Sequence, residues 1–120
     1  MKKKITVVEW VGWSEIEKYP KSPLGFLGGF FNWRESGMRW KDYLAAIPAE
    51  ARPYAEALRK EVVATGKRIT GEQHQYGSKG VPVFSDGTVA TFSYRGWGDI
   101  MAAIWSEEEN KDYNYMDFYM

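Results

Sequence analysis

The stretch that decides the fold is Val81–Trp105, which reads VPVFSDGTVATFSYRGWGDIMAAIW. Two runs rich in β-branched and aromatic residues, 81–84 and 88–94, flank the dipeptide Asp86-Gly87. This dipeptide readily adopts the positive φ angles of a tight turn between two strands. The pattern therefore predicts a β-hairpin.

After Tyr94 the apolar residues change to helical spacing. Gly96 and Gly98 give the backbone the freedom to turn from a strand into a helix. The residues that would form the apolar stripe of this helix are Trp97, Ile100, Met101 and Ile104. We therefore expect a strand, a turn and a helix entry within one short stretch.

Upstream of this stretch, the sequence predicts one strand and two helices. Residues 3–13 are apolar on both faces of an extended chain, which is typical of a central strand. A first helix, capped by Ser36, ends near Pro48. A second helix runs from about Pro53 to Ala64, with Gly66 beyond its end.

Two further strands complete the predicted fold. Residues 67–76 read as a strand weakened by Gly71, and the tail 113–120 alternates between a Met and Phe face and a Tyr and Asp face. The resulting order is β-α-α-β-β-β-α-β. We therefore expect one α+β domain over residues 1–120, with a mostly antiparallel sheet of about five strands and three helices chiefly on one face. The last helix should form a right-handed crossover to the final strand.

Length and composition favour a cytoplasmic globular protein. The chain of 120 residues is long enough for one core, and no apolar run is long enough to span a bilayer. Glu9 interrupts the apolar run after the N-terminal lysines, so we expect no signal peptide. The absence of cysteine fits a reducing compartment.

The aromatic content is high for so short a chain, with six Trp, eight Tyr and six Phe. Since one core would not enclose all of these rings, some should line a ligand site or a subunit interface. The residues that we expect there are Tyr113, Tyr115, Asp117, Tyr119, Trp97 and Tyr76. The alternative for the tail is plain packing under the helices.

The only histidine of the sequence, His74, is the one candidate for acid-base chemistry. On a strand, His74 would share a face with Thr70, Glu72 and Tyr76, so that Glu72 could orient the imidazole. No serine or cysteine nucleophile pattern accompanies it. One histidine also falls short of the converging ligands of a zinc site, so we predict no metal.

The run Gly96-Trp97-Gly98-Asp99 outlines a dinucleotide-binding motif between a strand and a helix. However, Met101 occupies the third glycine position, and Trp97 would crowd the pyrophosphate. Asp99 would also place a negative charge where the phosphates bind. We therefore predict no cofactor and interpret the glycines as features of a tight turn.

Two aromatic segments between the first strand and the helices allow several interpretations. Residues 30–41, FFNWRESGMRWK, interleave aromatic rings with Arg34, Arg39 and Lys41, as single-strand nucleic-acid surfaces do. Trp40 already belongs to the inward stripe of a helix and the net charge is zero, so we expect no nucleic-acid partner. The loop Leu24–Phe31 could be buried, an interface or a lid.

Three functions fit these patterns. The leading hypothesis is a non-enzymatic binding or interaction module that self-associates through an aromatic surface. We expect a homo-oligomer, with a dimer as the first candidate. The second is a small-ligand-binding protein or enzyme with a Tyr- and Trp-rich pocket that uses His74. The third is an inhibitor or immunity-type protein with a basic partner, because residues 61–120 carry 9 acidic and 5 basic side chains and residues 1–60 carry 7 and 11.

Overall fold

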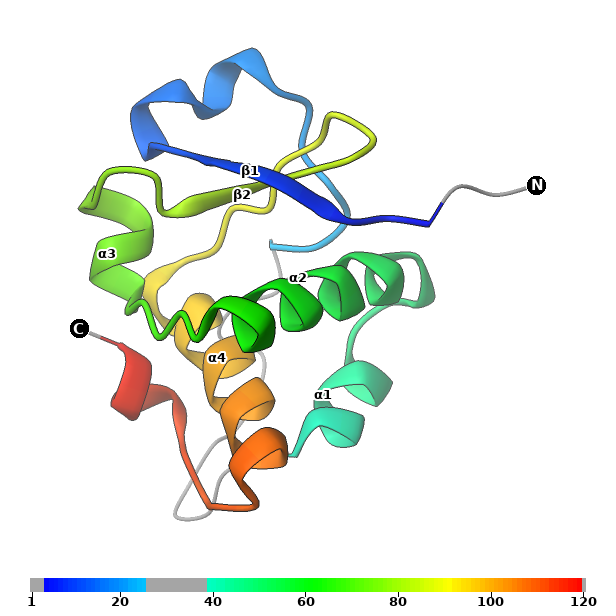
Figure 1. Cartoon of the computed structure of the whole chain (residues 1–120), viewed down its shortest axis with the longest axis vertical. Helices are drawn as coiled ribbons and strands as arrows, with labels where there is room; N and C mark the ends of the chain where they lie inside the picture. The colour runs from blue at the N-terminus through cyan, green and yellow to red at the C-terminus, as the bar shows by residue number, and fades with distance from the viewer. Residues whose placement is uncertain (1–3, 26–38, 120) are drawn as a thin grey trace.

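The computed structural model describes residues 4–25 and 39–119, and this part of the chain is α+β (Figure 1). It contains four α-helices, three short 3₁₀ helices and one two-stranded antiparallel sheet. The strands are β1 (Val7–Val11) and β2 (Val81–Phe84), and the α-helices are α1 (Trp40–Ala46), α2 (Arg52–Thr65), α3 (Gly71–Tyr76) and α4 (Tyr94–Glu109). The 3₁₀ helices are η1 (Trp13–Lys18), η2 (Ala49–Ala51) and η3 (Tyr115–Phe118).

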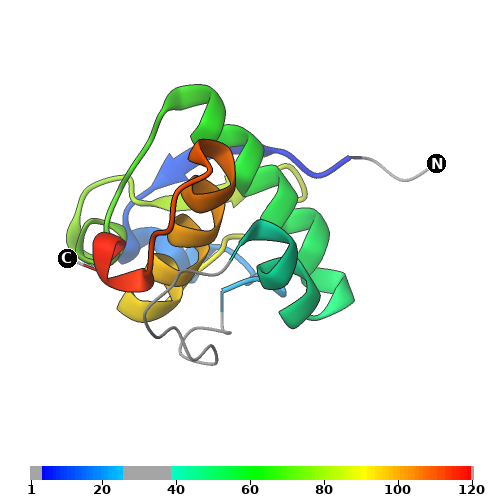
Figure 2. The same ribbon diagram turned by 90° about the horizontal axis from the view of Figure 1, so that it is seen from below.

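Helix α4 lies at the centre of the core. Every residue from Gly96 to Ser106 is buried, so most of the helix has no face toward solvent. Such a helix must be apolar or small on all sides, and the run Ile100–Trp105 has that composition. Helices α1, α2, α3 and η3 all pack against α4 (Figures 1 and 2).

The sheet is small, and β2 is its inner strand. All four residues of β2 are buried. On one side β2 pairs with β1, with Val7 opposite Phe84, Val11 opposite Val81 and an irregularity after Val7. On the other side Val89 forms an isolated bridge with Val83. Strand β1 is therefore an outer strand, not the central strand that its apolar sequence predicts.

Several predictions are confirmed. The class is α+β, and α2 and α4 lie where the sequence places helices. A tight turn is present at Asp86-Gly87, but the Gly87 N–H donates to the Phe84 carbonyl at 2.8 Å, so the central residues are Ser85 and Asp86, and only Gly87 of the predicted pair has a positive φ, 88°. The inward stripe of α1 is also present, with Trp40 and Tyr43 buried. The predicted cap, Ser36, lies outside the described residues.

The prediction of a five-stranded sheet with three helices is wrong, and the order β-α-α-β-β-β-α-β is wrong with it. Residues 67–76 are not a strand, because residues 71–76 form α3. The side chain of Thr70 accepts from the Gln73 N–H at 3.2 Å, and the Gln73 side chain accepts from the Thr70 N–H at 2.8 Å. This reciprocal capping satisfies the first turn of a helix and outweighs the strand pattern.

The tail and the second arm of the hairpin are not strands either. In the tail, Asn114 accepts from the Met116 N–H and Asp117 accepts from the Asn114 N–H, which starts η3. In residues 88–94, only isolated bridges form at Val89, and the chain enters α4 at once, with Ser93 as its cap. The predicted crossover to a final strand is therefore absent.

A glycine in α4 allows the tail to lie directly against the helix. A Cβ on Gly98 would lie 2.5 Å from the Tyr115 carbonyl oxygen, a separation that real contacts do not reach. The tail backbone occupies the space that any larger side chain would need. Gly98 is thus required for close packing of η3 on α4, and not for a turn between a strand and a helix.

In Gly98→Ala the new methyl group should force the tail backbone away, at a cost of about 2 kcal/mol. Alanine gains about 1 kcal/mol over glycine inside a helix, so we expect a net destabilisation of about 1 kcal/mol. Urea unfolding measures the difference. The control is Gly12→Ala, where a Cβ would meet its nearest neighbour at 3.6 Å and stability should not change. Equal stability of the two variants would contradict the packing argument.

Candidate functional site

Side chains from three elements form an aromatic surface that we call the tyrosine patch. Its members are Tyr76, Tyr94, Tyr115, Met116 and Tyr119. Tyr76 ends α3, Tyr94 begins α4, and the other three belong to η3 or follow it. Helix α3 and the tail lie together at the left of Figure 1. Residues far apart in the sequence therefore contribute to one surface.

The start of α3 holds these elements together. A Cβ on Gly71 would lie 2.6 Å from the Tyr94 carbonyl oxygen and 2.8 Å from that of Tyr119. Glycine therefore lets the first turn of α3 touch both backbones. The N–H of Glu72 donates to the Tyr119 carbonyl at 3.2 Å, which fixes the end of the tail against α3.

The four tyrosine rings form an unbroken chain of contacts. The centroids of Tyr76 and Tyr94 are 5.6 Å apart, those of Tyr94 and Tyr119 are 5.6 Å apart, and those of Tyr119 and Tyr115 are 6.1 Å apart. These separations and the tilted ring planes are those of favourable aromatic pairs. Tyr76 is nevertheless 72% exposed and Met116 67% exposed.

Charged groups lie around the patch. A hydrogen bond with Tyr76, together with desolvation, raises the pKa of Tyr94 to about 12, and the charge of Glu72 acts in the same direction. Tyr94 therefore stays neutral at physiological pH. The guanidinium of Arg95 lies 4.6 Å from the centroid of the Tyr115 ring. The surface thus combines aromatic area with both signs of charge.

Three of the predicted site residues lie elsewhere. Trp97 is fully buried in α4, and its indole N–H donates to the Ile69 carbonyl at 2.8 Å. Tyr113 packs on Phe118 and donates to the Glu109 carboxylate at 2.7 Å. Asp117 caps η3. The structure therefore brings together Tyr76, Tyr115 and Tyr119 of the predicted set and adds Tyr94 and Met116.

His74 lies inside the core and not on the face of a strand. Its ring stacks on Trp97 with a centroid distance of 4.4 Å and meets Trp13 and Phe92 edge on. Glu72 is exposed and does not orient the imidazole. Residues two positions apart point to different sides of a helix, whereas on the predicted strand they would share a face.

Both ring nitrogens of His74 are used by the backbone. Nδ1 lies 2.8 Å from the Gly80 carbonyl oxygen, which only accepts, so Nδ1 carries the proton. Nε2 accepts from the Phe92 N–H at 3.1 Å, so Nε2 carries none. The imidazole is therefore neutral. Burial lowers the pKa of His74 from 6.5 to about 4, although the bond to Gly80 acts in the opposite direction.

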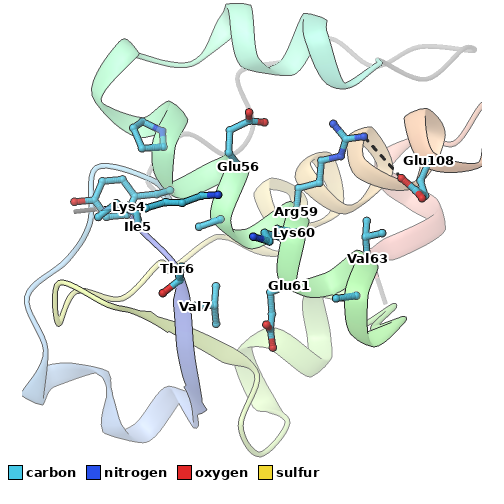
Figure 3. Close-up of a pocket in the computed structure, with 14 residues that line it drawn as sticks. Lys4, Ile5, Thr6, Val7, Glu56, Arg59, Lys60, Glu61, Val63 and Glu108 are labelled. Carbon is cyan, nitrogen blue, oxygen red and sulfur yellow. Dashed lines mark ion pairs between the residues drawn. The ribbon is translucent and has the colours of Figure 1, made fainter. Parts of the chain in front are cut away.

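A groove lies between the start of β1 and helix α2 (Figure 3). Its volume is about 1280 Å³. One wall is formed by residues 4–7 and the other by residues from Pro53 to Ala64, with Glu108 at one end. No local sequence pattern marks this groove, because its walls are distant in the sequence. His74 does not line it.

A smaller cavity of about 350 Å³ lies beside the aromatic rings that pack on His74. Trp13 and Phe92, two of the rings that cover His74, line this cavity, but His74 itself does not. The imidazole therefore faces neither space. The contacts of His74 are those of a core residue.

The excess charges of the two halves of the chain partly pair with each other. Arg59 lies 3.8 Å from Glu108, and Arg39 lies 3.3 Å from Asp112. Within the acidic half itself, Arg68 pairs with Glu109 and stacks over Trp105. The acidic half thus meets basic side chains of the same chain.

The two aromatic segments lie mostly outside the described residues. Leu24 and Gly25 are buried, while residues 26–31 and Arg34 are not described. Arg39 donates to the Ser106 carbonyl. Lys41 is exposed on α1.

Within residues 4–25 and 39–119, no three His, Asp or Glu side chains converge as a metal site would require. Asp99 is buried in the interior of α4 and not in its first turn as the motif suggests. Burial, reinforced by the charge of Asp99, raises the pKa of Tyr43 far above its usual value. None of the described helices is long and apolar enough to cross a membrane.

Comparisons with known proteins add no relative. No protein-family model matches the sequence, and no curated protein or solved structure shows significant similarity to the chain. Function must therefore be argued from the tyrosine patch, the groove and the buried histidine themselves.

The buried histidine predicts a loss of stability in mild acid. The unfolded chain takes up a proton at His74 below pH 6.5, while the folded chain takes it up only near pH 4. Stability should thus fall, by up to about 3 kcal/mol, as the pH decreases through this window. Urea unfolding above and within the window measures the effect, and the single imidazole NMR signal should not titrate before pH 4 is approached.

His74→Phe is the matched variant, because it keeps a ring on Trp97 but removes both nitrogens. Leaving the Phe92 N–H and the Gly80 carbonyl without partners should cost about 2 to 4 kcal/mol at neutral pH. The remaining stability should depend less on pH between 6.5 and about 4. An unchanged pH dependence would contradict the assignment.

Proposed function

We propose that this protein is a non-enzymatic binding module that forms a homodimer through the tyrosine patch. The observation that carries the proposal is the chain of four touching tyrosine rings, of which Tyr76 and Tyr119 are exposed while Tyr94 and Tyr115 are half-buried. Tyrosine is favoured at interfaces because it offers a large rigid area and a hydroxyl group at low entropic cost. The exposed side chain of Met116 adds an adaptable apolar contact.

The charges around the patch favour a second copy as the partner. In a two-fold dimer the same surface meets itself, so a suitable surface must be self-complementary. Near the tyrosine patch, acidic Glu72 acts on the pKa of Tyr94, and basic Arg95 lies over the Tyr115 ring. Two copies related by a two-fold axis can therefore place unlike charges opposite each other around an aromatic centre. We propose that this dimer is cytoplasmic. The reducing cytoplasm does not support disulfides, and the chain has no cysteine that would need one.

The other two functions have less support. An enzyme that used His74 would need an imidazole open to substrate, whereas both nitrogens bind backbone groups in the core. An immunity-type protein would need free acidic groups, whereas Glu108, Glu109 and Asp112 pair with arginines. We therefore do not pursue either function.

The double variant Tyr76→Ser with Met116→Ser tests the dimer. Both side chains are largely exposed, so the fold should be kept while the apolar centre of the contact is lost. We expect the dissociation constant of the dimer to rise at least about tenfold in sedimentation equilibrium. The control is Val8→Ser, which removes an exposed apolar side chain of β1, 58% exposed, outside the patch.

Two results would overturn the proposal. One is a wild-type protein that remains monomeric up to millimolar concentration. The other is a double variant that dimerises as tightly as the wild type, with Val8→Ser as the disruptive change.

A further inference from the structure

The outer edge of β1 has no strand beside it in the described part of the chain. Strand β2 covers the other edge, and the backbone of Thr6 is used on that side, because its N–H donates to Ser85 Oγ at 3.1 Å and its carbonyl accepts from the Ser85 N–H at 2.7 Å. Alternate residues of a strand direct their backbone groups to opposite edges. This alternation assigns the N–H and carbonyl groups of Val7, and those of Ile5 just before the strand, to the outer edge.

The pairing of Val7 supports this assignment. Val7 lies opposite Phe84, but the N–H of Phe84 donates to the Thr88 carbonyl at 2.8 Å, away from β1. Val7 is thus in a pair without hydrogen bonds, as the alternation requires. The backbones of Ile5 and Val7 together offer two N–H donors and two carbonyl acceptors. Their spacing matches that of the corresponding groups in a second extended chain.

The groove of Figure 3 lies on this open side. Its walls are residues 4–7 and α2, and no residue of β2 lines it. Side chains of an added strand would enter a space bounded by Ile5, Val7 and Val63. A strand edge next to a groove under a helix is a recurrent way to bind an extended peptide.

Two lysines of the groove favour a peptide that carries a carboxylate. Lys4 and Lys60 face the groove, and neither ammonium group makes an ion pair with another described residue. Of the acidic groups that line the groove, Glu108 pairs with Arg59, whereas Glu56 and Glu61 keep their negative charge. Glu61 accepts from the Trp10 indole, Glu56 accepts from the Trp40 indole, and the two carboxylates point in opposite directions in Figure 3.

The geometry points to a second binding surface, at which β1 takes up an extended acidic segment of a partner protein. The segment would pair with the outward backbone groups of Ile5 and Val7 and place a carboxylate between Lys4 and Lys60. This surface is separate from the tyrosine patch, because α3 and the start of β1 lie at opposite ends of the molecule in both Figures 1 and 2. The inference does not depend on the dimer.

Fluorescence anisotropy with a labelled peptide of alternating valine and glutamate tests this inference. We expect binding at micromolar to millimolar concentration, with NMR shifts at residues 4–7 and in α2. The same peptide N-methylated at alternate residues loses its backbone donors and should bind about tenfold more weakly. Lys60→Glu should weaken binding about tenfold and should favour a peptide with lysine in place of glutamate.

Lys41→Glu is the matched control, since Lys41 is an exposed lysine of α1 and does not line the groove. It should bind the acidic peptide as the wild type does, and so should the double variant of the tyrosine patch. Absence of binding at millimolar peptide, or equal binding of the N-methylated peptide, would overturn the inference. So would a change of oligomeric state in Lys60→Glu without peptide binding, which would make a second copy the occupant of the edge.

Discussion

The packing of the chain depends most on the contacts of the neutral His74 imidazole, which are two hydrogen bonds to the backbone and a stacked ring. His74 belongs to α3, and its side chain contacts three other segments. These are the Gly80 carbonyl before β2, the Phe92 N–H before α4 and the Trp97 ring within α4. A buried backbone donor or acceptor without a partner is costly, so one side chain that satisfies one of each fixes all these segments. This role also explains why the only histidine has no access to solvent.

Burial of α4 on every side sets the remaining architecture. Because residues 96–106 of this helix have no solvent face, the other elements must surround them, and the sheet needs only two strands. Close approach then depends on small residues. Gly98 admits the tail and Gly71 admits the carbonyls of Tyr94 and Tyr119. The tyrosine patch is a consequence of this packing, since the glycines bring its three elements to one surface.

The two surfaces at opposite ends of the molecule differ in chemistry. The tyrosine patch offers aromatic area, which in the proposed dimer would meet a second copy, whereas the edge of β1 would offer backbone groups of the kind that aggregation-prone edges have. The proteins that manage such edges often place lysine beside them, and Lys4 and Lys60 lie beside this one. The same lysines that discourage unspecific pairing would select an acidic strand.

The sequence by itself determined those elements whose local signals agree: the turn at Asp86-Gly87, the helix 52–65 with proline near its start and glycine after its end, and α4. Where signals conflicted, alternation suggested strands, and the capping side chains of Thr70 and Asn114 made helices instead. Only the tertiary structure decided that His74 is buried, that Tyr94 joins the patch and that β1 borders a groove. Each of these depends on contacts between residues distant in the chain, which no local period encodes.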